Sequence, residues 1–242
     1  MEDIVAELEH LKKSFGTKDV LKDINVTLKK GENLVVLGKS GSGKSVLIKC
    51  LVGLIDPDDG KAVLFGKNIS ELQNHELNLL RKRVGFLFQS AALYDSMTVR
   101  ENLEFPLRDL KDQDKTDTEA LIREALKNVG LEEAIDKMPS ELSGGMIKRV
   151  GLARTLILKP EIILYDEPTT GLDPITSKEI SNLILEVQRK YSTASIIITH
   201  DVACARITAN RIIIIKDGIF IAEGTFGELS SSEDEWIRSF FI

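Results

Sequence analysis

The feature that most constrains the fold is the stretch at residues 38–45, which reads GKSGSGKS and fits the pattern G-x-x-x-x-G-K-[ST]. An apolar, strand-like run at 33–37 precedes it, and an apolar, helix-like segment at 46–52 that ends at Gly53 follows it. Glycines let backbone N–H groups turn inward around phosphate oxygens, and the following helix presents its positive N-terminus to the same anion. The alternative, a plain glycine turn, is disfavoured because the flanking elements come in the order that a phosphate-binding loop requires.

The loop residues have distinct expected roles. Lys44 is expected to reach the β- and γ-phosphates of a nucleotide, and the Ser45 hydroxyl is expected to hold Mg²⁺. The candidate nucleotide-binding residues are Gly38, Lys39, Ser40, Gly41, Ser42, Gly43, Lys44, Ser45 and Val46.

Three further apolar runs, at 84–88, 162–165 and 195–199, are predicted strands that end in polar residues. They lead to Gln89, to Asp166 with Glu167, and to His200. Polar residues at the carboxyl ends of parallel strands point into the ligand crevice. Asp166 suits the water shell of a magnesium ion, and Glu167 can accept a proton from an attacking water. Taken singly, the two acids could cap the next element, and a lone histidine is more often structural.

Between residues 90 and 158 the pattern changes from strands to helices, with predicted helices at 116–129 and 147–158. No linker-like tract surrounds this region, which indicates a helical subdomain inserted into one domain. Ser143 followed by Gly144 and Gly145 precedes the second helix. This arrangement is either a second anion cradle or an ordinary helix start.

The two ends of the chain carry weaker signals. Residues 4–28 predict antiparallel strands around a turn at 16–19, 71–83 predict a helix, and 212–222 predict a hairpin. Phe15 is either a core aromatic, which spacing alone favours, or a platform for an adenine ring. The C-terminal apolar residues either pack on the same chain or dock on a partner. They are Trp236, Ile237, Phe240, Phe241 and Ile242.

Composition sets limits on location and partners. The 242 residues are 43% hydrophobic, enough for one domain with a subdomain, and the net charge of −6 argues against a general nucleic-acid binder. No apolar run is long enough to cross a bilayer, and the first residues do not resemble a signal peptide, so a cytoplasmic location is expected. Cys50 and Cys204 are expected to be buried, reduced thiols.

Taken together, these motifs resemble those of an ABC-type ATPase subunit, and the resemblance covers nearly the whole chain. It implies ATP and Mg²⁺ as cofactors, with Mg²⁺ between Ser45, Gln89 and Asp166. It also implies that Glu167 activates water and that His200 braces the γ-phosphate. Phe15 matches the adenine-stacking position, and this match reverses the preference for a core residue that spacing alone gives. Asp173 matches the D-loop, and the signature motif is matched by Ser143, Gly144, Gly145 and Met146.

The same resemblance implies an α/β fold of the P-loop NTPase type. A RecA-like parallel core, an N-terminal antiparallel β subdomain and an α-helical subdomain at about 90–158 would form a single domain at 1–242, with an apolar tail at about 230–242. A head-to-tail homodimer is implied, in which the signature motif and D-loop of one copy cover ATP held by the other. The region after Gln89 would contact transmembrane permease subunits at the cytoplasmic face of the inner membrane.

Two positions depart from the commonest ABC pattern, since Val46 replaces a threonine and Met146 replaces a glutamine. Segments 88–107, 143–150 and 165–177 look like those of the ATPases of Mla/MCE-type phospholipid transporters. That subfamily implies phospholipid movement between bacterial membranes, with MCE-type lipid-binding and accessory subunits. The alternatives are an ABC importer for amino acids or another small solute and, less favoured, a non-transport ABC ATPase.

Overall fold

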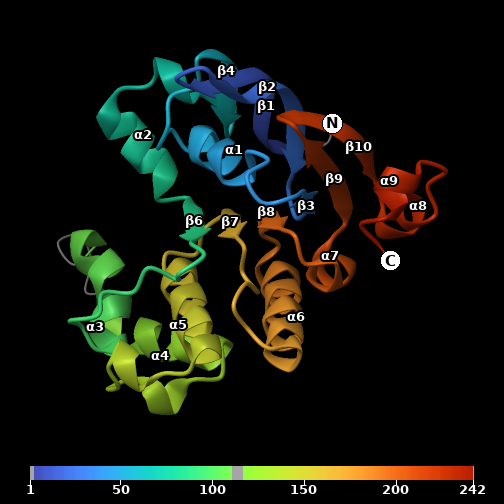
Figure 1. Cartoon of the computed structure of the whole chain (residues 1–242). Coiled ribbons are helices and arrows are strands. Elements are labelled where there is room, and N and C mark those ends of the chain that lie inside the picture. Colours follow the sequence, from blue (N-terminus) through green and yellow to red (C-terminus); the bar gives the residue numbers. More distant parts are fainter. Residues whose placement is uncertain (1–2, 111–116, 242) are drawn as a thin grey trace.

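The computed structural model describes residues 3–110 and 117–241, which form two β-sheets and the helices around them (Figure 1). The smaller sheet is antiparallel, in the order β2-β1-β4-β5, and the larger sheet has the order β10-β9-β3-β8-β7-β6. The strands of the smaller sheet are β1 (Ile4–Phe15), β2 (Lys18–Lys29), β4 (Asp59–Leu64) and β5 (Lys67–Asn68). Those of the larger sheet are β3 (Asn33–Leu37), β6 (Val84–Leu87), β7 (Ile162–Asp166), β8 (Ala194–Thr199), β9 (Arg211–Lys216) and β10 (Ile219–Gly224).

The larger sheet is parallel from β6 to β9, and β10 joins it antiparallel through a tight turn at Asp217 and Gly218. Both turn residues have positive φ, as a two-residue hairpin of this hand requires. Val35 of β3 belongs to the core on one face of the sheet, and Leu34 and Val36 belong to the core on the other. Both faces are therefore covered, which explains why the strands read as continuous apolar runs.

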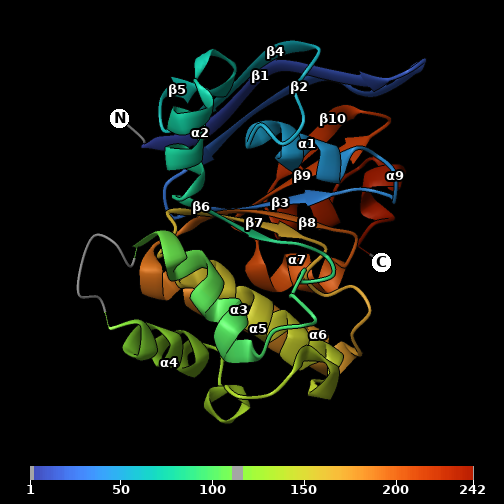
Figure 2. The ribbon, with the colours of Figure 1, turned by 90° about the vertical axis from the view of Figure 1, so that its left-hand side faces the viewer.

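The helices form layers on the two faces of this sheet (Figure 2). Helix α1 lies between the two sheets, whereas α5, α6 and α7 cover the opposite face of the larger sheet. The helices are α1 (Lys44–Leu51), α2 (Asn74–Arg81), α3 (Val99–Glu104), α4 (Thr118–Asn128), α5 (Gly144–Leu156), α6 (Pro174–Tyr191), α7 (Val202–Thr208), α8 (Phe226–Ser230) and α9 (Glu235–Arg238). Short 3₁₀ turns lie at Ile69–Glu71, Phe105–Leu110, Glu132–Ala134 and Pro139–Glu141.

The predicted strands and the hairpin are confirmed, but two predicted helices begin elsewhere. The helix expected from residue 147 begins at Gly144, because the Ser143 side chain caps it by accepting the Met146 N–H at 3.3 Å. The helix expected from residue 71 begins at Asn74 after a separate 3₁₀ turn. The helix expected at 116–129 is α4, and residue 116 lies outside the described residues.

The structure decides between the alternative placements that the sequence leaves open for Phe15 and for the C-terminal tail. Phe15 is 50% exposed, so the core interpretation of this residue is wrong. The tail packs on its own chain: Phe241 meets Phe226 edge-on at 5.1 Å between ring centroids, and Trp236 meets Phe240 at 4.8 Å. Ile242 lies outside the described residues. The proposed bounds of the domain and its helical subdomain stay predictions.

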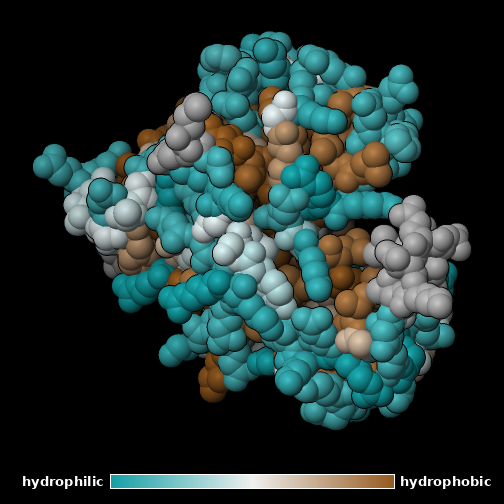
Figure 3. Space-filling view, turned by 180° about the vertical axis from the view of Figure 1, so that it is seen from behind, coloured by the Kyte–Doolittle hydropathy of each residue, from teal (hydrophilic) through white to brown (hydrophobic). Residues whose placement is uncertain are grey.

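The surface seen from behind is mostly hydrophilic, with apolar side chains gathered in patches around the middle of that face (Figure 3). Cys50 and Cys204 are buried and free, as predicted. Across residues 3–110 and 117–241, the structure has no helix with the length and hydropathy that a transmembrane span needs.

Candidate functional site

The glycine-rich loop connects the end of β3 to the start of α1 and has a backbone that only glycine adopts easily. Gly43 caps α1 with φ of +101°, in a left-handed conformation. A Cβ atom at this position would lie 2.8 Å from the carbonyl oxygen of Val20, so no larger residue fits without displacing β2. The sequence therefore fixes a tight loop directly at the N-terminus of a helix.

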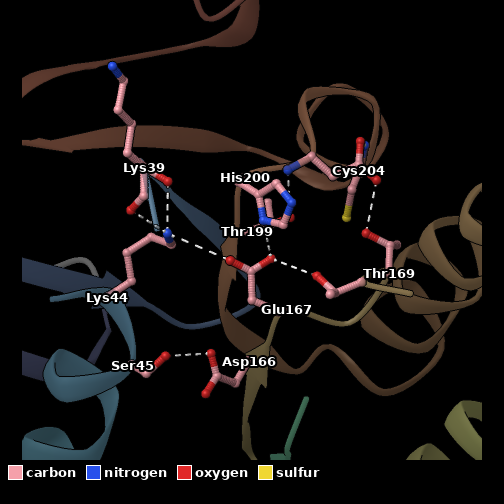
Figure 4. Close-up of polar contacts among 12 residues, drawn as sticks. Lys39, Lys44, Ser45, Asp166, Glu167, Thr169, Thr199, His200 and Cys204 are labelled. Atoms are coloured by element: carbon pink, nitrogen blue, oxygen red, sulfur yellow. Dashed lines mark hydrogen bonds and ion pairs between the residues drawn. The ribbon is translucent and has the colours of Figure 1, made fainter. Parts of the chain in front are cut away.

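Lys44, the first residue of α1, points back across this loop (Figure 4). Its amine donates hydrogen bonds to the carbonyl oxygens of Gly38 at 2.7 Å and Lys39 at 3.1 Å, and it lies 3.6 Å from Oε1 of Glu167. The residue is only 5% exposed. Burial lowers the pKa of Lys44, and the nearby Glu167 carboxylate opposes that shift.

The two carboxylates at the end of β7, Asp166 and Glu167, have different hydrogen-bond partners. Ser45 donates a hydrogen bond to Oδ1 of Asp166 at 2.8 Å. Oε2 of Glu167 accepts a hydrogen bond from the Thr170 hydroxyl at 3.1 Å and lies 2.8 Å from Nδ1 of His200. Glu167 is thus held between a lysine on one side and a histidine on the other, and both lie at the edge where the parallel strands end (Figure 4).

A cavity of about 570 Å³ brings most of the predicted site residues together. Among the predicted residues, it is lined by Gly38, Lys39, Ser40, Gly41, Gly43, Lys44, Ser45, Val46, Gln89, Glu167 and His200. Asp166 and Ser42 do not line the cavity, but Asp166 accepts a hydrogen bond from Ser45, which does, and the Ser42 hydroxyl is buried. Phe15 does not line this cavity.

The predicted signature motif and D-loop lie together elsewhere in the same chain. A Cβ atom on Gly145 would lie 2.6 Å from Cγ2 of Thr176, so the start of α5 packs closely against the start of α6. The Asp173 carboxylate caps α6 by accepting hydrogen bonds from the N–H groups of Ile175 and Thr176 and from the Thr176 hydroxyl. These bonds, the hydroxyl foremost, lower the pKa of Asp173. None of Ser143, Gly144, Gly145, Met146 and Asp173 lines the cavity.

Four residues at the site were not predicted from the sequence. Thr170 holds Glu167, Val20 of β2 and Phe240 of the C-terminal tail line the cavity, and Lys148 of α5 donates to the backbone oxygens of Gln89 and Glu167. Thr170 stands three residues after an expected catalytic acid, which is the one usable signal. Lys148 and Phe240 reach the site from distant parts of the chain, and no spacing in the sequence reveals that.

The residues present fit a nucleotide with magnesium. The Ser42 hydroxyl is buried and has no hydrogen-bond partner within the described residues, which leaves it free to meet a phosphate oxygen. The Ser45 hydroxyl and the Asp166 carboxylate are oxygen ligands of the kind that Mg²⁺ takes beside phosphate groups.

Comparison with known protein families defines the class of the chain. Residues 21–170, more than half of its length, match the model of the family described as ABC transporter. The chain therefore belongs to the ABC transporter family, and it contains the ATPase domain of that family. ATP with Mg²⁺ is the cofactor pair of that family, so this prediction is confirmed.

Several curated relatives cover nearly the whole chain. The probable ribonucleotide transport ATP-binding protein mkl of Mycobacterium tuberculosis is 38% identical over 234 residues, which are 97% of this chain and 65% of that protein. The intermembrane phospholipid transport system ATP-binding protein MlaF of Haemophilus influenzae is 37% identical over 234 residues, which are 89% of its own length. The methionine import ATP-binding protein MetN of Mesorhizobium japonicum is 38% identical over 220 residues, which are 60% of its length. The chain thus spans about two thirds of the mkl proteins that it matches.

Solved structures confirm the fold class. The structure of cbiO1 from Clostridium perfringens, part of the ABC transporter complex cbiONQ, superposes with a TM-score of 0.86 at 31% identity and covers 98% of this chain and 94% of that one. A dimeric structure of the ATP-binding cassette MJ0796 bound to ADP and Pi gives a TM-score of 0.83 at 32% identity and covers 91% and 98%.

Proposed function

We propose that the chain binds and hydrolyses ATP and thereby energises a membrane transporter. The observation that carries this proposal is the Glu167 carboxylate, which is held at the mouth of the phosphate-binding loop between Lys44 and His200. A carboxylate in that position can orient a water molecule and accept its proton. A loop that only stored nucleotide would not need a base beside the terminal phosphate.

The phosphate-binding loop and the polar side chains of the cavity have distinct roles in this mechanism. The loop backbone and Lys44 bind the phosphates, Glu167 takes the proton of the attacking water, and His200 holds the carboxylate and braces the γ-phosphate. Ser45, Asp166 and Gln89 would hold Mg²⁺, which would neutralise part of the phosphate charge. Thr170 fixes the rotation of the Glu167 side chain through its hydroxyl.

The same mechanism calls for a second copy of the chain. The signature residues Ser143, Gly144, Gly145 and Met146 lie with Asp173 outside the cavity that they are expected to complete. A head-to-tail homodimer would bring this surface of one copy over the loop of the other. Measuring the mass of a Glu167→Gln variant with and without ATP tests this arrangement, because a monomer under both conditions is incompatible with it.

A groove at the β6 edge of the larger sheet is suited to the permease subunit. This groove of about 360 Å³ is lined by Phe88, Tyr94 and Phe105, among others. Tyr94 and Phe105 are 43% and 39% exposed, and their rings lie 4.8 Å apart. Exposed aromatic side chains in a groove favour a helix of a partner protein. Phe105→Asp is expected to abolish co-purification with the permease, whereas Ile219→Asp at the opposite sheet edge should preserve it.

The proposed cargo is phospholipid, moved between bacterial membranes with MCE-type lipid-binding subunits. The resemblance of segments 88–107, 143–150 and 165–177 to Mla/MCE-type ATPases and the similarity to MlaF support it. The similarity to MetN favours a second candidate, an importer of amino acids or another small solute. Purifying the chain with its membrane partners and identifying the bound ligand by mass spectrometry separates the two. A complex that holds a hydrophilic solute and no lipid would exclude phospholipid transport.

A further inference from the structure

Lys148 is a buried cation on α5 that the mechanism above does not use. It is 5% exposed and lies one turn after the signature glycines. Its amine donates a short hydrogen bond to the carbonyl oxygen of Gln89 and a second, of 3.3 Å, to the carbonyl oxygen of Glu167. One side chain therefore joins the signature helix to two segments that end at the cavity.

Of the two residues whose backbone Lys148 contacts, Glu167 has an energetically unfavourable backbone conformation. Glu167 has φ of +52°, in the left-handed region that residues other than glycine rarely adopt. Its N–H bonds to the oxygen of Ile198 at 2.9 Å, and its carbonyl also accepts the Thr170 N–H at 3.2 Å. Such a conformation persists only where the surroundings fix it, and the Lys148 bond helps to do so from a third element.

The electrostatic environment of Lys148 also indicates a functional role for this side chain. Burial lowers the pKa of Lys148, and the carboxylates of Asp166 and Glu167 act in the opposite direction. Removing a charged amine from water is expensive unless hydrogen bonds and opposite charges compensate. An uncharged side chain would avoid the cost of burying that charge, yet it would remove the Lys148 hydrogen bond from the Gln89 oxygen and leave the Glu167 oxygen with the Thr170 N–H.

We propose that Lys148 is a positioning residue that ties the signature helix to Glu167 and Gln89 within one chain. Rotation or displacement of α5 would then move the Glu167 backbone directly, so the catalytic carboxylate takes its productive position only when the signature helix is correctly placed. The kinetic part of this inference rests on the proposed ATP hydrolysis. The structural part concerns the nucleotide-free chain alone.

The test compares Lys148→Met with Arg149→Met, a control on the same helix. Arg149 donates to the carbonyl oxygen of Val129 at 3.1 Å and pairs with Glu179 at 2.8 Å, and within the described residues it donates to neither Gln89 nor Glu167. In Lys148→Met we expect kcat to fall about tenfold while the affinity for ATP stays within about twofold. Lys148→Arg, which keeps a cation and its donors, should recover most of the lost rate.

Hydrogen–deuterium exchange of the nucleotide-free protein provides a readout that does not depend on turnover. The N–H groups of Thr170, bonded to Glu167, and of Ala91, bonded to Phe88 at 2.8 Å, should exchange faster in Lys148→Met and unchanged in Arg149→Met. If Lys148→Met does not fold, Lys148→Gln takes its place. Exchange and kcat equal to those of the control would overturn the inference. A wild-type chain that never hydrolyses ATP would instead refute the proposed function. The exchange comparison alone would then decide whether Lys148 positions the Glu167 and Gln89 backbone.

Discussion

Replacing Glu167 with glutamine tests the proposed chemistry most directly. The two side chains have the same shape, so the amide oxygen can keep the 3.1 Å bond from Thr170, and the packing of a residue that is 13% exposed is preserved. The amide cannot take a proton from water. Because a positioned general base contributes about 10²–10⁴-fold, we expect turnover to fall at least about a hundredfold. That loss corresponds to roughly 2.7 kcal/mol in the barrier.

Binding should respond differently from turnover. The substitution removes the negative charge 3.6 Å from the Lys44 amine, which is then freer to meet a phosphate, so ATP affinity should be unchanged or higher. Steady-state phosphate release and isothermal titration calorimetry measure the two quantities. Glu161→Gln is the matched control, because Glu161 pairs with Arg83 at the surface, where ion pairs contribute little. Hydrolysis by Glu167→Gln at a rate near that of this control would reject Glu167 as the base.

Three further outcomes follow from other parts of the structure. Gly43→Ala forces a Cβ atom to within 2.8 Å of the Val20 oxygen at a positive φ, so we expect a loss of about 1–3 kcal/mol in thermal unfolding and weakened ATP binding by calorimetry. Burial raises the pKa of Cys50 and of Cys204 to about 11, which lowers the thiolate fraction about a hundredfold. A thiol reagent at pH 8 should therefore label both cysteines only in urea, and rapid labelling of the folded chain would contradict this. The Tyr165 hydroxyl is buried without a partner in the described structure, so Tyr165→Phe should match or exceed the wild-type stability, by up to about 1 kcal/mol, in urea titrations.

The sequence predicted the central strands and the phosphate loop because their signals are local. The run at 33–37 is apolar on both faces and ends at a glycine pattern, and both features follow from neighbours in the chain. Helix starts were predicted less well. Because Ser143 caps α5, Gly144 and Gly145 are part of the helix, although glycine has a low intrinsic helix propensity. The capping bond decides that boundary, and propensity does not reveal it.

The features that the sequence did not predict depend on contacts between segments that are far apart in the chain. Phe15 precedes a turn in a strand pattern that suits a core residue, yet it is half exposed because β1 extends beyond the core to its turn. Phe240 lines the cavity only because the tail folds back over the C-terminal end of the larger sheet. The C-terminal residues were recognised as too apolar for a free tail, but a pattern of apolar residues cannot name the surface that they cover.

The packing of the tail makes the chain its own spectroscopic probe. Trp236 is the single tryptophan, its ring contacts Phe240, and the Lys216 amine lies 4.2 Å from the centre of that ring. Since Phe240 lines the phosphate cavity, occupancy of the cavity should alter the tryptophan emission through this contact. Intrinsic fluorescence would then follow nucleotide arrival and release in real time without an attached label.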